Sequence, residues 1–113
     1  MRRIVAYKRY FLDFYEAQND KVQSKIEWTL GLIRDLDQIP KKYFKQVTGT
    51  KGLYQIRIEF ESNIYRVFSF FDEGNLVILG NAFQKKSQKT PKGEIELAKN
   101  RKQRYLKRRK RDG

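Results

Sequence analysis

The chain has 113 residues, and its 26 lysine and arginine side chains against 13 acidic ones leave a net charge of +13. This length suits one small domain with one core, and a hydrophobic share of 39% argues against global disorder. Such a charge attracts polyanions and releases counterions when they bind, so RNA, DNA, the ribosome and an acidic protein are all compatible partners. A merely solvated, charged coat is the simpler alternative.

The sequence contains neither cysteine nor histidine. Disulfides, zinc-finger-type metal sites and histidine general-base catalysis are therefore excluded, and we expect no metal and no cofactor. No apolar run reaches the roughly 20 residues that a membrane helix needs. The start of the chain lacks the apolar core and cleavage site of a signal peptide. We therefore expect a cytoplasmic protein without a membrane partner.

The first third of the chain predicts one strand and two helices. Residues 3–7 have the composition of an edge strand, and residues 9–17 that of a short helix. Residues 21–36 carry apolar side chains at spacings of three and four, which is typical of an amphipathic helix, and Asn19 is placed to cap it. Pro40 ends this helical region. The apolar stripe consists of Val22, Ile26, Leu30, Ile33 and Leu36, and is widened by Leu32 and Trp28.

Three strand candidates follow in quick succession, at 53–60, 64–71 and 76–83. They come after a polar and basic segment, 41–51, which allows a helical turn around 43–44. Short connections make antiparallel neighbours. We therefore expect an α+β domain with a four-stranded, mainly antiparallel sheet. Three strands form a meander, the N-terminal strand completes the sheet, the N-terminal helices cover one face, and a C-terminal helix follows.

That C-terminal helix is expected from Lys92 onward, with a thin apolar stripe. Residues 107–111 form a run of like charges that repel one another, so the end of the helix should fray. We expect a single domain over residues 1–106 and a basic, flexible tail over 107–113.

The third meander strand ends in a basic segment. Residues 83–90 place an aromatic ring, three lysines and two hydroxyl groups after a buried strand, with no carboxylate among them. A rigid strand that ends in cations and an aromatic ring is suited to hold a phosphodiester and the base beside it. Because neighbouring residues of a strand point to opposite faces, only one of Lys85 and Lys86 should face such a site.

Three stretches together resemble the RelE/ParE toxin superfamily: 52–57, 65–68, and 83–91 followed by a Glu-Ile helix. Within it they are most similar to the phage-derived, HigB-like toxins of bacterial type II toxin–antitoxin modules. The resemblance implies a sheet with helices on one side and a concave face that grips RNA. It also implies ribosome-dependent, metal-independent cleavage of messenger RNA, and neutralisation by a co-encoded antitoxin, usually with a helix-turn-helix domain.

Carried over residue by residue, the functional positions of the family fall on Arg57, Tyr65, Arg66, Phe83, Lys85 and Lys86. Gln55 stands where some relatives have another basic residue. Tyr105 is the only tyrosine near the C-terminus that could replace the usual acid or base. The resemblance therefore leaves the proton-transfer residues open.

Cleaving RNA through its own 2′-hydroxyl needs a base, cations that stabilise the phosphorane, and an acid for the leaving oxygen. Arg57 and Arg66 suit the second role, because arginine stays charged and can grip two phosphate oxygens. Lys85 or Lys86 can act as base if neighbouring cations and partial burial lower its pKa. These four residues are the catalytic candidates. The RNA-binding candidates are Tyr54, Tyr65, Phe83, Lys89 and Lys51, with Tyr54 or Phe83 stacking on a splayed base.

Each candidate also has a simpler interpretation. The arginines could form cross-strand salt bridges with Glu59 or Asp72, the lysines could belong to a solvated loop, and Tyr54 and Phe83 could pack in the core. Two other functions remain as alternatives: gyrase inhibition of the ParE kind, and a non-catalytic nucleic-acid-binding module.

Overall fold

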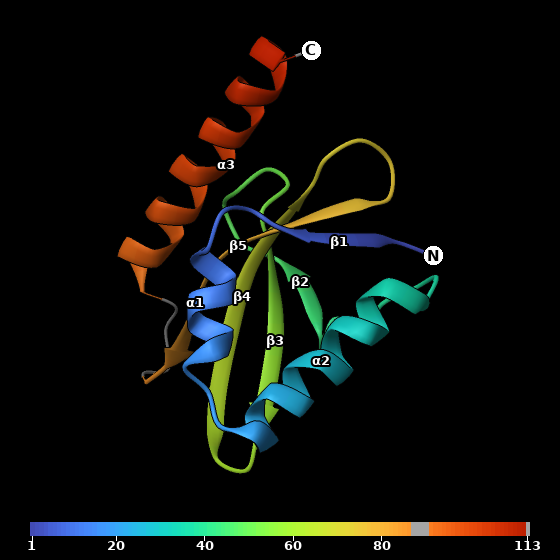
Figure 1. The fold of residues 1–113 in the computed structure, drawn as a ribbon, viewed down its shortest axis with the longest axis vertical. Coiled ribbons are helices and arrows are strands. Elements are labelled where there is room, and N and C mark those ends of the chain that lie inside the picture. Colours follow the sequence, from blue (N-terminus) through green and yellow to red (C-terminus); the bar gives the residue numbers. More distant parts are fainter. Residues whose placement is uncertain (87–90, 113) are drawn as a thin grey trace.

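The computed structural model describes the backbone of residues 1–86 and 91–112, and side chains up to residue 109. It has helices on both sides of a five-stranded mixed sheet (Figure 1). The elements are β1 (Arg3–Ala6), α1 (Tyr10–Glu16), α2 (Asp20–Asp35), β2 (Phe44–Gln46), β3 (Tyr54–Phe60), β4 (Asn63–Phe71), β5 (Leu76–Lys85) and α3 (Lys92–Asp112). The α+β class expected from the sequence is confirmed. No helix in the described ranges is long and apolar enough to cross a membrane.

The strands lie in the order β1-β5-β4-β3-β2. β3, β4 and β5 form the expected antiparallel meander, and β1 lies at the edge, parallel to β5. The expected number of four strands was wrong, because β2 pairs with the other edge of β3. The polar composition of this segment does not indicate a strand. In the structure, the Phe44 ring of β2 stacks on Tyr54 of β3 with 4.6 Å between the ring centroids.

One face of the sheet carries the main core, covered by α1 and α2. Asn19 caps α2, since its side-chain oxygen accepts a hydrogen bond of 2.9 Å from the backbone N–H of Val22. Ile26 and Ile33 of the predicted stripe are completely buried. They pack in the same cluster as Ile56 and Ile58 of β3, which alternate with polar residues along the strand.

The other face is covered in part by α3. Its Ala98 packs in a second, smaller cluster with Val47, Leu53 and Phe68, and Phe83 lies against this cluster. The helix contacts β4 and β5. The sheet therefore has one face closed by the N-terminal helices and another that α3 covers only over part of its extent (Figure 1).

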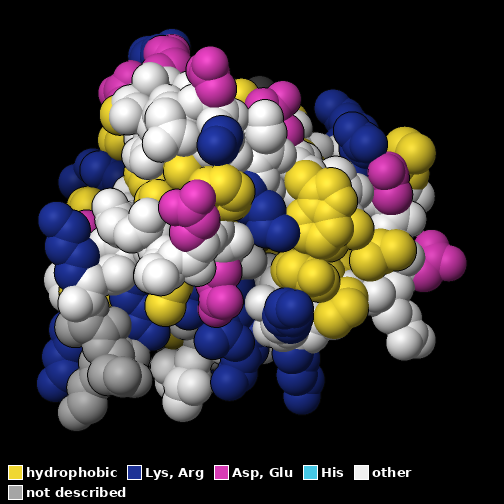
Figure 2. Space-filling model, turned by 90° about the horizontal axis from the view of Figure 1, so that it is seen from below, with side chains coloured by type: hydrophobic (Ala, Val, Ile, Leu, Met, Phe, Trp, Pro, Cys, Tyr) yellow, Lys and Arg dark blue, Asp and Glu magenta, His cyan; other side chains and the backbone are white. Residues whose placement is uncertain are grey.

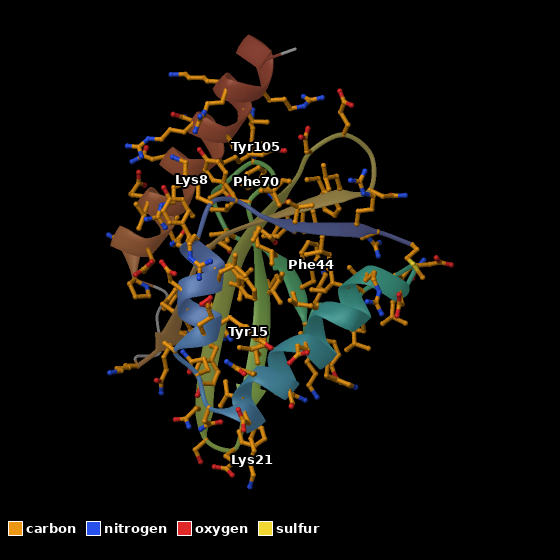
Figure 3. The ribbon with its side chains drawn as sticks, in the orientation of Figure 1. Lys8, Tyr15, Lys21, Phe44, Phe70 and Tyr105 are labelled. Carbon is orange, nitrogen blue, oxygen red and sulfur yellow. The ribbon has the colours of Figure 1, made fainter. Side chains whose placement is uncertain are left out.

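The C-terminal half of α3 is attached to the sheet through Tyr105 and Arg109. The Tyr105 hydroxyl donates a hydrogen bond of 2.7 Å to Asp72, and the Arg109 guanidinium lies 3.1 Å from the same carboxylate. The Tyr105 ring also packs edge-on against Phe70 at 5.4 Å (Figure 3). The helix continues through Asp112, whereas the like-charge run predicted fraying from residue 107. The ion pair of Arg109 offsets some of that repulsion.

Candidate functional site

Arg57, Arg66 and Phe83 form a row across three neighbouring strands. Arg57 of β3 pairs with Arg66 of β4, and Arg66 pairs with Phe83 of β5. Directly opposed residues share a face of the sheet, and so do residues two apart in one strand. Lys85 therefore lies on the same face as Phe83, opposite the face that α1 and α2 cover.

A small hollow of about 100 Å³ opens on this face. It is lined by Lys45, Gln46, Thr48, Gln55, Arg57, Arg66 and Lys85. Among the described residues that line it, four are cationic and none is a carboxylate. Lys45 was not predicted as a site residue, because the strand that carries it was missed. Once β2 is paired with β3, the register places Lys45 beside Gln55 and on the side of the hollow.

Arg66 is the most buried charged residue of the hollow, with 2% of its surface exposed. Its guanidinium donates a hydrogen bond of 3.1 Å to the carbonyl oxygen of Tyr65. Burial, and then the neighbouring charge of Arg57, lower the pKa of Arg66, while Glu59 opposes this shift. A guanidinium that is desolvated beside a second one is held in an unfavourable state that a bound anion would relieve.

The simpler interpretation, in which these arginines form salt bridges with Glu59 or Asp72, finds no support in the described side chains. None of their ion pairs involves Arg57 or Arg66. Asp72 instead binds Tyr105 and Arg109.

Lys85 stands at the edge of the hollow on β5 and is half-buried. Burial lowers the pKa of its ammonium group, and the charges of Arg66 and Arg57 lower it further. This direction increases the fraction of neutral amine near physiological pH, which is what a general base requires.

Two of the predicted RNA-binding residues lie on the wrong face. Tyr65 is buried in the main core, where its ring meets that of Phe14. Tyr54 stacks on Phe44 and packs edge-on against Phe71. The alternation of the strands explains both: each tyrosine has the opposite phase to the neighbouring arginine. We therefore correct both assignments: Tyr65 is buried in the core, and the half-buried ring of Tyr54 packs on Phe44 and Phe71, on the face opposite the hollow.

The remaining predicted residues differ in position. Phe83 lies on the face of the hollow but is half-buried against the α3 cluster. Lys86 is exposed just after β5, and Lys51 is exposed in the loop between β2 and β3; neither lines the hollow. Lys89 lies outside the described residues.

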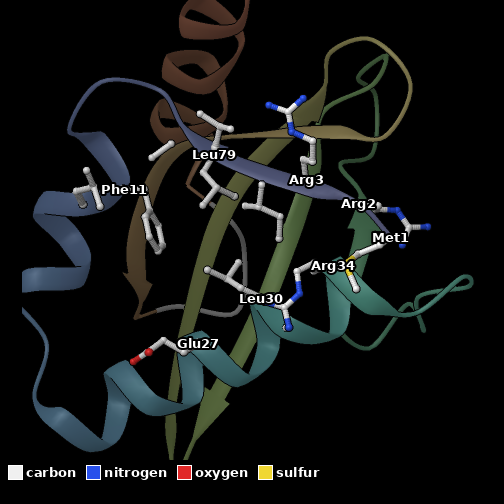
Figure 4. A pocket seen from close by; sticks show the side chains of 13 residues that line it. Met1, Arg2, Arg3, Phe11, Glu27, Leu30, Arg34 and Leu79 are labelled. Atoms are coloured by element: carbon white, nitrogen blue, oxygen red, sulfur yellow. The ribbon is translucent and has the colours of Figure 1, made fainter.

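A larger cleft, of about 730 Å³, lies between β1, α1 and α2 (Figure 4). Apolar side chains such as Phe11, Leu30 and Leu79 contribute to its lining. The guanidinium of Arg2 is occupied at the end of α2, where it donates to the carbonyl oxygens of Ile33 and Asp37 at 3.0 and 2.9 Å. Size alone therefore does not identify the site: the small hollow holds the convergent cationic groups that phosphate chemistry needs, and the large cleft is mainly apolar.

The fold and the hollow define a small α+β domain with a strongly cationic, partly open sheet face. The model of one protein family, described as Phage derived protein Gp49-like (DUF891), matches residues 13–103. The chain therefore belongs to this family, whose members are RelE/ParE-like toxins of toxin–antitoxin systems. The resemblance to that superfamily is confirmed, and an antitoxin partner is implied. A search of curated proteins finds no match.

Proposed function

We propose that this toxin is an endoribonuclease of the HigB-like kind, which cleaves messenger RNA on the ribosome without a metal and so inhibits translation. One observation carries the proposal. Arg57, Arg66 and Lys85 come from three different strands and line one hollow that has no carboxylate among its described lining residues. Such a site favours a single phosphodiester anion.

The reaction that fits this hollow is attack of the ribose 2′-oxygen on the adjacent phosphorus. The O2′–P bond forms and the P–O5′ bond breaks, which leaves a 2′,3′-cyclic phosphate and a 5′-hydroxyl. A base must take the proton of the 2′-hydroxyl, and an acid must give one to the leaving 5′-oxygen. The atoms therefore balance without any co-reactant.

Lys85 is the proposed base, because its lowered pKa favours the neutral amine. Arg66 and Arg57 stabilise the phosphorane, whose oxygens carry more charge than those of the ground state. Lys45 is the proposed acid. It lies on β2 and Lys85 on β5, so the two lysines flank the arginines in the strand order and can serve opposite sides of one phosphorus.

The net charge of +13 supports binding to the ribosome, where ribosomal RNA surrounds the message. The basic run of 107–111 in α3 is a candidate anchor for this contact. We further propose that the antitoxin is co-encoded, carries a helix-turn-helix domain, and keeps the toxin inactive in the cytoplasm.

Induction of the toxin without its antitoxin, followed by mapping of the 5′ ends of cellular messages, tests the proposal. The expected result is growth arrest with cuts inside translated frames. Arrest with intact messages would remove the nuclease assignment, and a DNA-damage response in those cells would point to gyrase instead. A catalytically impaired Arg66→Ala variant, produced at equal level, is the control.

A further inference from the structure

A second hollow, of about 250 Å³, lies at the edge of β3 beyond the point where β2 begins. It is lined by Lys25, Thr29, Lys42, Tyr43, Arg57, Glu59 and Glu61. Arg57 lines this second hollow and also the small hollow on the sheet face described above. The backbone N–H of Arg57 donates a hydrogen bond of 2.8 Å to the carbonyl oxygen of Tyr43. This bond connects β3 to the turn that carries Tyr43. The two hollows are therefore neighbours that have Arg57 in common.

Aromatic surface borders this second hollow. Tyr43 forms part of its wall, and the Trp28 ring meets Tyr43 edge-on at 5.7 Å. Trp28 is 49% exposed, an unusual position for so large an aromatic ring in a folded domain. The ammonium group of Lys25 lies 4.1 Å from the centre of its ring. Seen from this end of the molecule, a patch of hydrophobic side chains lies beside lysine and arginine side chains (Figure 2).

The polar groups of the hollow are of two kinds. Lys25, Lys42 and Arg57 are donors with positive charge, and Glu59 and Glu61 are acceptors with negative charge. Within the part of the chain that the structure describes, neither glutamate forms an ion pair. A ligand that combines an aromatic ring, N–H donors and a phosphate would match the aromatic wall, the carboxylates and the cations in turn.

We propose that this second hollow binds one nucleotide of the RNA, next to the nucleotide whose phosphate occupies the first hollow. The base lies against Tyr43, and its amino group donates a hydrogen bond to Glu59 or Glu61. Arg57 holds the phosphate between the two nucleotides. The inference rests on the proposed function, because it takes RNA as the substrate. It adds a specificity site to that function.

The carboxylates set the preference among bases. Cytosine, adenine and guanine present an exocyclic amino group that a glutamate can accept from, whereas uracil presents none. Uracil offers only its N3–H, which lies between two carbonyl oxygens that the carboxylates would repel. Uridine should therefore bind weakest at this position.

Trp28 makes the test direct, because it is the single tryptophan of the chain. The full-length protein is titrated at low salt with hexamers of cytidine, adenosine or uridine and with inorganic polyphosphate, and the tryptophan emission is followed. We expect saturable quenching by the cytidine and adenosine hexamers, with binding about tenfold weaker for uridine. Polyphosphate should bind without comparable quenching, since it has no base. Equal affinity for the three hexamers, or RNA binding that leaves the emission unchanged, would overturn the inference.

A Glu59→Ala/Glu61→Ala double variant should lose the discrimination against uridine. Glu96→Ala, which removes one exposed carboxylate from α3, is the control for charge removal away from the hollow and should keep it. The two proposals fail separately. If messages are still cut but uridine binds as well as cytidine, the base pocket is wrong and the nuclease remains. If the base preference is present but messages stay intact, the nuclease is wrong and the pocket remains.

Discussion

Arg57 and Arg66 lie directly opposite each other on β3 and β4, and among the described side chains neither forms an ion pair with a carboxylate. Like charges in this position destabilise a sheet, and the burial of Arg66 adds to the unfavourable energy. Binding of an anion would offset both contributions, which is the pattern expected of the proposed phosphate site.

Replacing Arg66 by alanine should lower the cleavage rate about 10²–10³-fold, the loss typical of removing one transition-state donor. The thermal midpoint should fall little or rise, because a desolvated charge next to Arg57 disappears. Cleavage of a message on purified ribosomes and thermal unfolding give the two readouts. Arg104→Ala, an exposed arginine of α3, is the control. Full activity of a folded Arg66→Ala protein would refute the site assignment.

The activity should rise with pH while Lys85 loses its proton, because only the neutral amine can accept the proton of the 2′-hydroxyl. Burial and the two arginines lower the pKa of this group. The increase in activity should therefore occur at a lower pH than the ordinary pKa of a lysine. The Lys85→Arg variant keeps the charge but should lose both the rise and most of the activity. Single-turnover rates across pH measure this, and an unchanged profile in the variant would exclude Lys85 as the base.

The attachment of α3 through Tyr105 should depend on pH in two directions. The bond to Tyr105 lowers the pKa of Asp72, so its stabilising effect is present above the unfolded pKa of about 3.9 and is lost as the pH falls through the folded value. Burial and the bond to Asp72 raise the pKa of Tyr105 to about 12. That contribution is present below the unfolded value of about 10 and is lost as the pH rises through about 12.

Tyr105→Phe keeps the ring but removes the hydroxyl group, and leaves the largely buried Asp72 carboxylate without this donor. We expect a loss of about 1–3 kcal/mol in the free energy of unfolding at neutral pH. Denaturant unfolding at several pH values measures this. The difference between the two proteins should shrink at both extremes; a difference that is zero at neutral pH would show that the hydroxyl does not stabilise the attachment.

Cleavage should survive chelation by EDTA. The chain has no histidine or cysteine, and no carboxylate is among the described residues that line the basic hollow. Ribosomes need magnesium themselves, so sedimentation is used in parallel to check that they stay intact. Loss of cleavage on intact ribosomes, restored by added magnesium, would contradict a mechanism that uses only side chains.

The sequence predicted the meander and both N-terminal helices, because alternation, helical spacing and short turns are local patterns. Arg57 and Arg66 came from the family resemblance, and the register of β3 and β4 places them directly opposite each other. β2 was missed for a physical reason. Its three residues are stabilised by pairing with β3, a long-range interaction that local composition does not reveal. Because β2 was missed, Lys45 was missed as well. It could have been found only by asking which segment covers the open edge of β3.

The tyrosines show a second limit. Tyr54 and Tyr65 belong to motifs that pointed to RNA, yet the period of two already placed each on the face opposite its neighbouring arginine. Applying that alternation to every motif residue would have placed both on the face opposite the hollow. The second hollow is different, since it combines α2, the 41–43 turn and the edge of β3. No local pattern predicts that meeting of three separate segments.

The most direct test of the central claim uses purified protein, translating ribosomes and a defined message whose cut site has been mapped. A single 2′-deoxy nucleotide is placed at that cut site, which removes the attacking hydroxyl and leaves the rest of the message unchanged. The predicted result is that the natural message is cut, with a 2′,3′-cyclic phosphate on the upstream product, and the deoxy message is not. Equal cutting of both messages, or translation arrest with the natural message intact, would contradict the account.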